Sequence, residues 1–206
     1  MYRVISLIAF LICLLSLTYH LFRLIRLGLP KDYSKKIGDI KAAVTYSFVG
    51  AMNPFQKESA YLHFPTYTAG ILYHIGTFVS LAIYILILFN TSLPNSFRPI
   101  LIFLLAISGL SGTGILIKRI SLKKLRYLSN PDDFISNLLV TIFQVSTLLL
   151  LYRGSFAPYY YMSTAILFLY LPLGKLKHSI YFFAARWHLG FFYGWRGIWP
   201  VKKIEQ

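Results

Sequence analysis

The most regular pattern along the chain is a series of long apolar stretches separated by shorter polar connections. A helix that crosses the hydrocarbon layer of a membrane needs about 20 mostly apolar residues. The pattern predicts five transmembrane helices, over about residues 4–22, 67–90, 98–117, 134–152 and 158–174. The sequence therefore predicts an all-α integral membrane bundle in a single domain, residues 1–206, whose fifth helix extends beyond the membrane to about residue 190.

Composition agrees with this interpretation. The chain is 57% hydrophobic and only 13% charged, which is far from the composition of soluble domains. The first apolar stretch is too long for a secretory signal and no small-residue cleavage site follows it, so we keep it as a helix. The single cysteine, Cys13, lies inside that stretch, which excludes disulfides, thiolate metal clusters and covalent haem attachment within the chain.

The net charge is +15, and the basic residues that cause it are distributed unevenly between the two sides of the predicted bundle. Of the 21 lysines and arginines, only Arg3, Arg98 and Arg153 fall on one side of the predicted bundle. The positive-inside rule then predicts an N-terminus outside and a C-terminus in the cytoplasm, which five spans satisfy. The basic residues do not accompany a recognition motif on a soluble face, so we expect no nucleic-acid partner.

Histidine is the residue type that stands out in this apolar chain. The five are His20, His63, His74, His178 and His188. Ionisable side chains within a span are costly and mark function or pairing. On one continuous helix, the eleven residues from His63 to His74 would give about 16 Å of rise and place both on one face to within roughly 20°.

The second and fifth predicted helices are antiparallel, so they can present histidines to each other at matched depths. His74 would meet His178, and His63 would meet His188. One neutral imidazole from each of two facing helices is the arrangement that holds a b-type haem in a bundle. The ten residues from His178 to His188 leave a mismatch of roughly 80° on an unbroken helix, which a bend would remove.

Other site chemistries fit less well. A closed zinc site usually takes four ligands, and no thiolate or carboxylate lies near His74 or His178 in the sequence. The six acidic residues fall at the cytoplasmic face or in the tail, which argues against a paired-carboxylate acid and base. Ser179 next to His178 has no accompanying aspartate within the membrane, which argues against a hydrolase. Buried, hydrogen-bonded structural histidines are the plain alternative to haem ligation.

Three stretches carry a family resemblance: ILYHIG (71–76), GILIKRISLKKLRYL with DDFISNLLV (114–140) and LFLYLPLGKLKH (167–178). They resemble the membrane gamma subunit of respiratory nitrate reductase, and are similar to the haem b subunits of heterodisulfide-reductase-like and dissimilatory sulfite-reductase-linked complexes. The resemblance covers about residue 65 to the C-terminus, and the first helix matches in kind only. Its most specific part is a proline, a basic residue and then Leu-x-His at the end of the fifth helix.

This resemblance implies a five-helix cytochrome b in the inner membrane of a prokaryote. Such a subunit passes electrons between membrane quinone and an iron-sulfur subunit on the cytoplasmic face, within a hetero-oligomer. His74 and His178 match the family's ligands for the haem nearer the cytoplasm. The other pair of positions holds Tyr84 and Tyr160, so the family's outer haem is expected to be absent and a quinone site to lie in the cytoplasmic half.

Several residues keep more than one interpretation. His63 and His188 are candidates for a second haem b, for contact with quinone or for plain interfacial positions, and His20 is either interfacial or a quinone contact. Arg186 and Arg196 are candidates for contact with haem propionates or with the partner subunit. The three glycines of SGLSGTG (108–114) serve either close helix packing or a flat cofactor against bare backbone.

The sequence thus predicts a haem b subunit, with one or two haems, of a quinone-linked respiratory complex. Substrate chemistry would belong to its partner subunits, and this chain has no catalytic residues of its own. A haem-free membrane anchor or assembly subunit is the alternative. A small transporter is a third interpretation, for which Pro172 and Gly174 offer the one candidate helix break.

Overall fold

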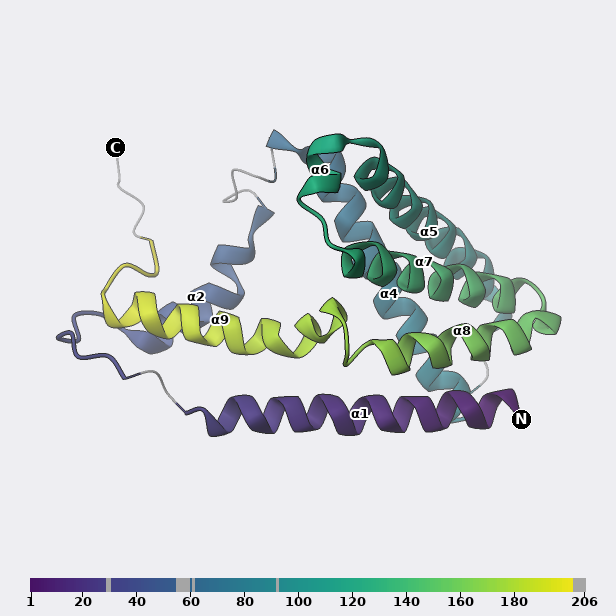
Figure 1. The fold of residues 1–206 in the computed structure, drawn as a ribbon, viewed down its shortest axis with the longest axis horizontal. Coiled ribbons are helices and arrows are strands. Elements are labelled where there is room, and N and C mark those ends of the chain that lie inside the picture. The colour runs from purple at the N-terminus through teal and green to yellow at the C-terminus, as the bar shows by residue number, and fades with distance from the viewer. Residues whose placement is uncertain (29–30, 55–59, 61, 92, 202–206) are drawn as a thin grey trace. The chain divides into compact units, whose positions relative to one another are not determined.

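The structure is a computed structural model that describes residues 1–28, 31–54, 60, 62–91 and 93–201. The helices are α1 (Tyr2–Arg26), α2 (Ile40–Phe48), α4 (Phe64–Leu88), α5 (Arg98–Ser121), α6 (Lys123–Tyr127), α7 (Pro131–Tyr152), α8 (Ala157–Tyr170) and α9 (His178–Trp195). Short 3-10 turns occupy Gly50–Met52, Asn95–Phe97, Gly154–Phe156 and Lys175–Lys177. The described residues contain no strand, so the predicted all-helical fold is confirmed for them (Figure 1).

Four helical segments are long and apolar enough to cross a membrane: Tyr2–Arg26, Phe64–Leu88, Asn95–Ser121 and Pro131–Tyr152. They match the first four predicted spans to within a few residues at each end. Most side chains in these windows are not buried inside the protein, as expected for helices that contact lipid. These segments indicate a multi-pass membrane protein.

The fifth predicted helix is shorter than expected. It was predicted over 158–174, whereas α8 ends at Tyr170. Pro172 explains the difference, because proline has no backbone N–H to donate to the carbonyl four residues earlier and its ring crowds that carbonyl. The chain turns instead, with the N–H groups of Leu173 and Gly174 both donating to the Tyr170 carbonyl, and the predicted extension is the separate helix α9.

The described chain forms two compact units. The first comprises Met1–Ser16 and Pro65–Leu176, and the second comprises Leu17–Phe64 and Lys177–Gln206. In the first unit, α5 packs on α7 and α7 on α8, while α4 meets α5 where Gly76 faces Ser108. The start of α1 joins α4 through Arg3, whose guanidinium donates to the carbonyls of Ile87 and Leu88 at the end of that helix.

The core of the first unit has an aromatic part and a polar part. The aromatic part consists of Phe10, Tyr84, Phe143, Tyr160 and Phe168, whose ring centroids lie 5.0 to 6.5 Å apart in the contacting pairs. Tyr84 also accepts a hydrogen bond from Ser6 of α1 at 3.0 Å. The polar part centres on Gln144, which is completely buried.

The second unit is built on α2 packed against α9, a pairing that the sequence analysis did not predict. The two helices are antiparallel and approach closely, because Gly190 leaves room for Val44 and Gly194 for Ala43. Ser47 donates to the backbone carbonyl of Arg186 at 2.7 Å. The α2–α9 pair gives a defined structure to part of the long connection between the first two predicted spans.

Candidate functional site

His74 lies on α4, near the middle of a candidate span, and its side chain is exposed. The imidazole Nδ1 is 2.7 Å from the carbonyl oxygen of Gly70, one turn earlier on the helix. A carbonyl can only accept, so this hydrogen bond requires the proton on Nδ1. The lone pair of Nε2 is then available to a ligand, which is the tautomer found in metal-bound histidines whose other nitrogen donates to a backbone carbonyl.

The surface around His74 is apolar. Ile71, Ile75 and Phe78 on the same helix are exposed, by 41%, 42% and 65% respectively. Gly70, which accepts the hydrogen bond from His74, has open space where a side chain would begin. A histidine on such a face needs a partner for Nε2 within the membrane, since an unsatisfied polar group is costly in hydrocarbon.

The backbone of α4 is anchored beside His74 by a buried polar cluster. The carbonyl of Tyr73 accepts hydrogen bonds from Gln144 Nε2 at 2.9 Å, Thr77 Oγ1 at 2.8 Å and Ser108 Oγ at 3.3 Å. The Tyr73 hydroxyl crosses to α7, where it donates to the carbonyl of Asn137 at 2.8 Å. These bonds fix the rotation of α4 about its axis, and therefore the direction in which the His74 side chain points.

This polar cluster is not among the features predicted from the sequence. After Asn137, Gln144 is the only amide side chain in the fourth predicted helix. Amide side chains within a membrane span often form hydrogen bonds between helices. That signal was available, but the partners Tyr73, Thr77 and Ser108 are spread over two other helices. Their meeting depends on how the helices are rotated, which periodicity does not determine.

His178 is the first residue of α9, and its side chain is exposed. It belongs to the second unit, whereas His74 belongs to the first. Its position differs from the prediction in one respect: His178 begins a separate helix after the turn at Pro172, instead of closing the fifth membrane helix.

The predicted alignment of His63 with His74 is wrong, and the predicted mismatch between His178 and His188 remains. His63 lies in the turn before α4, so it does not share a continuous helix with His74. Pro65 explains this, because proline is accepted in the first turn of a helix and stops its extension toward the N-terminus. His188 lies on α9 together with His178, so this continuous helix keeps the roughly 80° between them.

The remaining predicted residues also have defined places in the second unit. Arg196 forms an ion pair with Asp32, with Nη1 2.6 Å from Oδ2, and its guanidinium lies 3.8 Å from the centroid of the Phe192 ring. Arg186 lies 5.5 Å from the Phe182 ring. The Nδ1 of His20 is 3.3 Å from the hydroxyl of Tyr181 on α9.

Tyr84 and Tyr160, at the positions of the resembled family's other ligands, are completely buried in the aromatic core. Their ring centroids are 6.4 Å apart, and Phe168 packs against Tyr84 at 5.0 Å. Packed side chains therefore fill the space between these two positions.

Two of the three glycines of SGLSGTG lie in close contacts between helices. Gly112 lies against Tyr73 and Thr141, and Gly109 against Val145, so these two allow close helix packing. Gly114 has open space around it. The packing interpretation therefore holds for Gly109 and Gly112.

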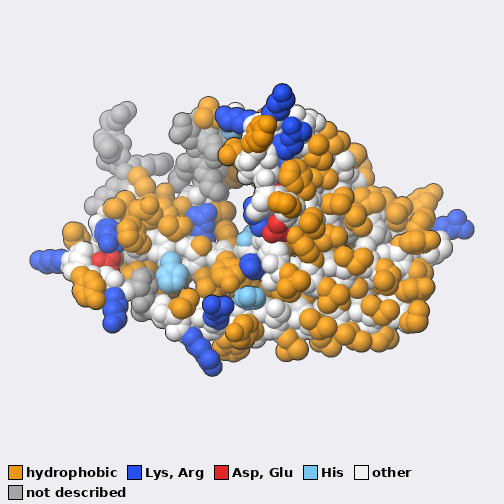
Figure 2. Space-filling model, viewed as in Figure 1, with side chains coloured by type: hydrophobic (Ala, Val, Ile, Leu, Met, Phe, Trp, Pro, Cys, Tyr) orange, Lys and Arg blue, Asp and Glu red, His pale blue; other side chains and the backbone are white. Residues whose placement is uncertain are grey.

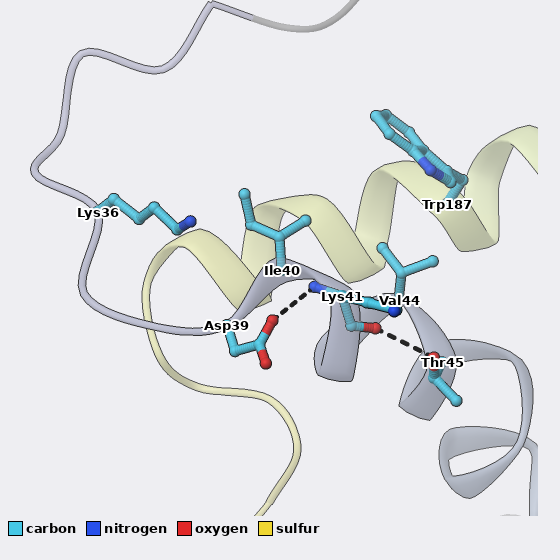
Figure 3. A pocket seen from close by; sticks show the side chains of 7 residues that line it. All are labelled: Lys36, Asp39, Ile40, Lys41, Val44, Thr45 and Trp187. Atoms are coloured by element: carbon cyan, nitrogen blue, oxygen red, sulfur yellow. Dashed lines mark hydrogen bonds between the residues drawn. The ribbon is translucent and has the colours of Figure 1, made fainter.

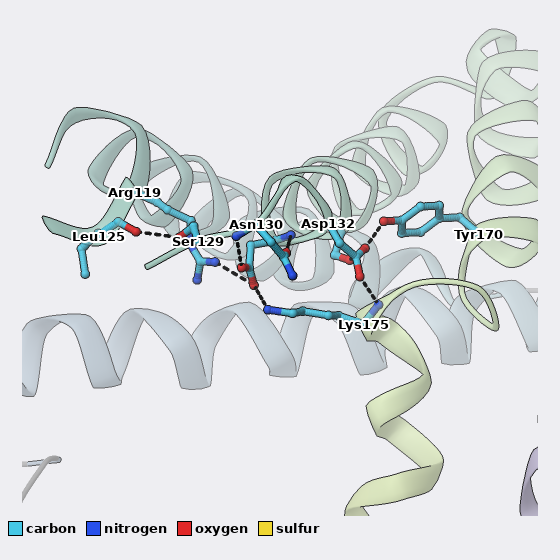
Figure 4. A network of polar contacts seen from close by, with 9 residues as sticks. Arg119, Leu125, Ser129, Asn130, Asp132, Tyr170 and Lys175 are labelled. Atoms are coloured by element: carbon cyan, nitrogen blue, oxygen red, sulfur yellow. Dashed lines mark hydrogen bonds and ion pairs between the residues drawn. The ribbon is translucent and has the colours of Figure 1, made fainter. Parts of the chain in front are cut away.

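A charged network joins the start of α7 to the end of α8 (Figure 4). Asp132 accepts hydrogen bonds from the Tyr170 hydroxyl and from the backbone N–H of Lys175. Asp133 pairs with Lys175 at 2.6 Å and with Arg119 at 3.0 Å, and it also completes a capping box with Asn130. Both aspartates are thus used to hold the ends of helices in place.

One pocket of about 440 Å³ opens on the second unit, between the start of α2 and Trp187 of α9 (Figure 3). Its walls include Lys36, Asp39, Ile40 and Val44. Asp39 is occupied as the N-cap of α2, where its carboxylate accepts from the N–H groups of Lys41 and Ala42. The pocket contains none of the histidines.

Within the described residues, no group of three or more histidine, cysteine, aspartate or glutamate side chains is placed to hold a metal ion. An axially ligated haem needs only two such side chains. Comparison of the chain with protein-family models, curated proteins and solved structures gives no match.

Proposed function

We propose that this chain is the haem b membrane subunit of a respiratory redox complex. It would carry electrons between quinone in the membrane and an iron-sulfur subunit on the cytoplasmic side. The observation that carries the proposal is the hydrogen bond from His74 to the Gly70 carbonyl, which leaves Nε2 as a ligand on an exposed apolar face. The sequence resemblance to haem b subunits is the second support.

The proposed topology has five spans with the N-terminus outside, and α8 is the fifth crossing. Support comes from the two ends of α8. Only Arg153 and the turn Gly154–Phe156 separate its start from the end of α7, and Tyr170 at its end hydrogen-bonds to Asp132 in the first turn of α7. Since α7 is a candidate span, a helix that returns from its end to its start would cross the same layer.

The proposed haem ligands are His74 and His178. A haem bound there would supply a one-electron centre between two-electron quinone chemistry and a one-electron iron-sulfur partner. The residues of this chain would hold and orient the group: Gly70 fixes the tautomer of His74, and the Tyr73 carbonyl fixes the rotation of α4. The aromatic packing between Tyr84 and Tyr160 supports a single haem, in the cytoplasmic half.

We propose plainer roles for the second histidine pair and the two arginines. With His63 outside α4, the spacing argument for a second haem loses its basis, so we propose one haem. Arg196 is engaged with Asp32, which favours a structural role over contact with a haem propionate. Arg186 remains the better candidate for such a contact, and the quinone site is proposed for the cytoplasmic half near the haem.

Three substitutions in the full chain test the ligand assignment: His74→Ala, His178→Ala and, as a matched control, His20→Ala. Haem per chain is measured in the purified proteins by extraction and visible spectroscopy. We expect the first two variants to lose the haem and the control to keep it. Retention of haem in His74→Ala would contradict the assignment, and absence of haem from the parent would favour the haem-free anchor.

A further inference from the structure

The residues around α6 form a basic and apolar surface at one end of the first unit. We name it the basic ledge and define it as Leu122, Lys123, Lys124, Arg126, Tyr127 and Leu128. All six side chains are exposed, and the three apolar ones strongly so: 48% for Leu122, 82% for Tyr127 and 77% for Leu128. Figure 2 shows Lys and Arg side chains gathered beside hydrophobic ones at the end of the unit where Figure 1 places α6.

The ledge is held rigidly at the end of a candidate span. Only Leu122 separates α6 from α5, and the N–H of Leu122 donates to the carbonyl of Lys118 in the last turn of α5. On the other side, Ser129 donates to the Leu125 carbonyl at 2.8 Å, and the Arg119–Asp133 ion pair ties α5 to the start of α7. A short helix fixed where a span ends lies at the depth of the lipid headgroups.

The positive charge of the ledge is not neutralised by the described protein. Lys123, Lys124 and Arg126 form no ion pair with a described residue, in contrast to Arg119 and Lys175. Asp132 and Asp133, the acidic residues of the neighbouring α7 turn, are already engaged by Tyr170, Lys175 and Arg119. The three cations are therefore available to an external anion.

We propose that the basic ledge binds the headgroup of an anionic phospholipid. Lys123, Lys124 and Arg126 would hold the phosphate, while Leu122, Tyr127 and Leu128 would insert among the acyl chains and glycerol groups. Cations next to exposed leucine and tyrosine at the membrane surface are the chemistry of anionic-lipid recognition. The depth of α6 and its exposed apolar residues favour lipid over an acidic protein. This inference is independent of haem.

The test uses the full chain in an uncharged detergent, titrated with short-chain phosphatidylglycerol and phosphatidylcholine and followed by native mass spectrometry. The ledge variant combines Lys123→Gln, Lys124→Gln and Arg126→Gln. The matched control, Lys35→Gln with Lys36→Gln and Lys41→Gln, removes the same charge from the second unit. Thermal unfolding of both variants checks that each is folded.

We expect the parent and the control to prefer phosphatidylglycerol, and the ledge variant to lose that preference by about tenfold or more. Equal affinity of the parent for both lipids would overturn the proposal, as would an equal loss in both variants. Displacement of the lipid by inorganic phosphate at the same concentration would assign the site to free phosphate instead. An unchanged lipid preference in the ledge variant, with lost binding of polyglutamate, would assign the ledge to an acidic protein.

Discussion

The ring of His74 donates through Nδ1 to the carbonyl oxygen of Gly70, at 2.7 Å. This contact joins two residues on consecutive turns of α4, and it selects the tautomer in which Nε2 can bind a metal. Because a haem-binding histidine needs this tautomer and a defined ring orientation, the contact is the structural basis of the proposed function.

The second histidine pair gives the first prediction. Under the one-haem proposal, His63→Ala and His188→Ala keep the haem content of the parent, because neither residue is a ligand. Haem is counted per chain in the purified single and double variants. A loss of half the haem in either variant would establish a second haem held by this pair.

Close packing of α4 on α5 gives the second prediction. A Cβ atom at Gly76 would collide with the side chain of Ser108, so Gly76→Ala should destabilise the folded protein by about 1–3 kcal/mol. Gly114→Ala is the control, since nothing lies near that position. The control should leave stability unchanged or raise it by up to about 1 kcal/mol, because alanine favours the helix.

Unfolding of both glycine variants is followed by circular dichroism in detergent with increasing denaturant. A stability loss of equal size in the two proteins would show that packing against Ser108 is not what restricts position 76.

The buried amide of Gln144 gives the third prediction. Gln144→Leu removes the donor to the Tyr73 carbonyl and the acceptor for Ser108. We expect a loss of about 1–2 kcal/mol, since hydrogen bonds between membrane helices are modest. Ile142→Val, at an exposed position of the same helix, should change stability by less than about 0.5 kcal/mol. The free energies of unfolding of the two variants are compared in denaturant. Equal losses would show that the hydrogen bonds of Gln144 do not contribute to stability beyond an ordinary side chain of this helix.

The Asp32–Arg196 pair gives the fourth prediction, a dependence on pH. Hydrogen bonds from the Ser34 hydroxyl and backbone N–H, and then the Arg196 guanidinium, hold the pKa of Asp32 below its usual value of 3.8. A depressed pKa means that this stabilisation is complete above the usual value and is lost as the pH falls through the folded-state pKa. The second unit should therefore loosen only below that value.

Tryptophan fluorescence reports this transition, because Trp195 donates to the carbonyl of Ser34 at 2.7 Å. The parent and Asp32→Asn are titrated from about pH 6 to about pH 2, a range that spans the carboxyl pKa values. The variant should lack the acid transition seen in the parent. Identical titration curves would mean that a different group controls it.

Hydrophobic patterning predicted most of the fold. Four of the five predicted helices appear as candidate spans because a run of about 20 apolar residues is a strong, local signal. The end of α8 could also have been read from Pro172, since the effect of proline on a helix is local. The α2–α9 pairing could not be predicted from the sequence. It depends on contacts of Gly190 and Gly194 with α2, which lies well over a hundred residues away in the sequence.

The sequence predicts which residue types form the candidate site, but it does not predict how those residues are arranged. Histidine in an apolar span draws attention to His74 by composition alone. The Gly70 hydrogen bond follows from helical spacing and could have been expected. The polar support around Tyr73 could not, because three helices have to be rotated correctly before Gln144 and Ser108 meet its carbonyl.

The most direct test of the central claim is the reduced-minus-oxidised visible spectrum of the purified full chain, with haem extracted and counted. The proposed function predicts the spectrum of a b-type cytochrome and one haem per chain, held without covalent attachment. A protein that is folded by circular dichroism, supplied with haem and still colourless would contradict it. The histidines would then be structural, and the chain a membrane anchor.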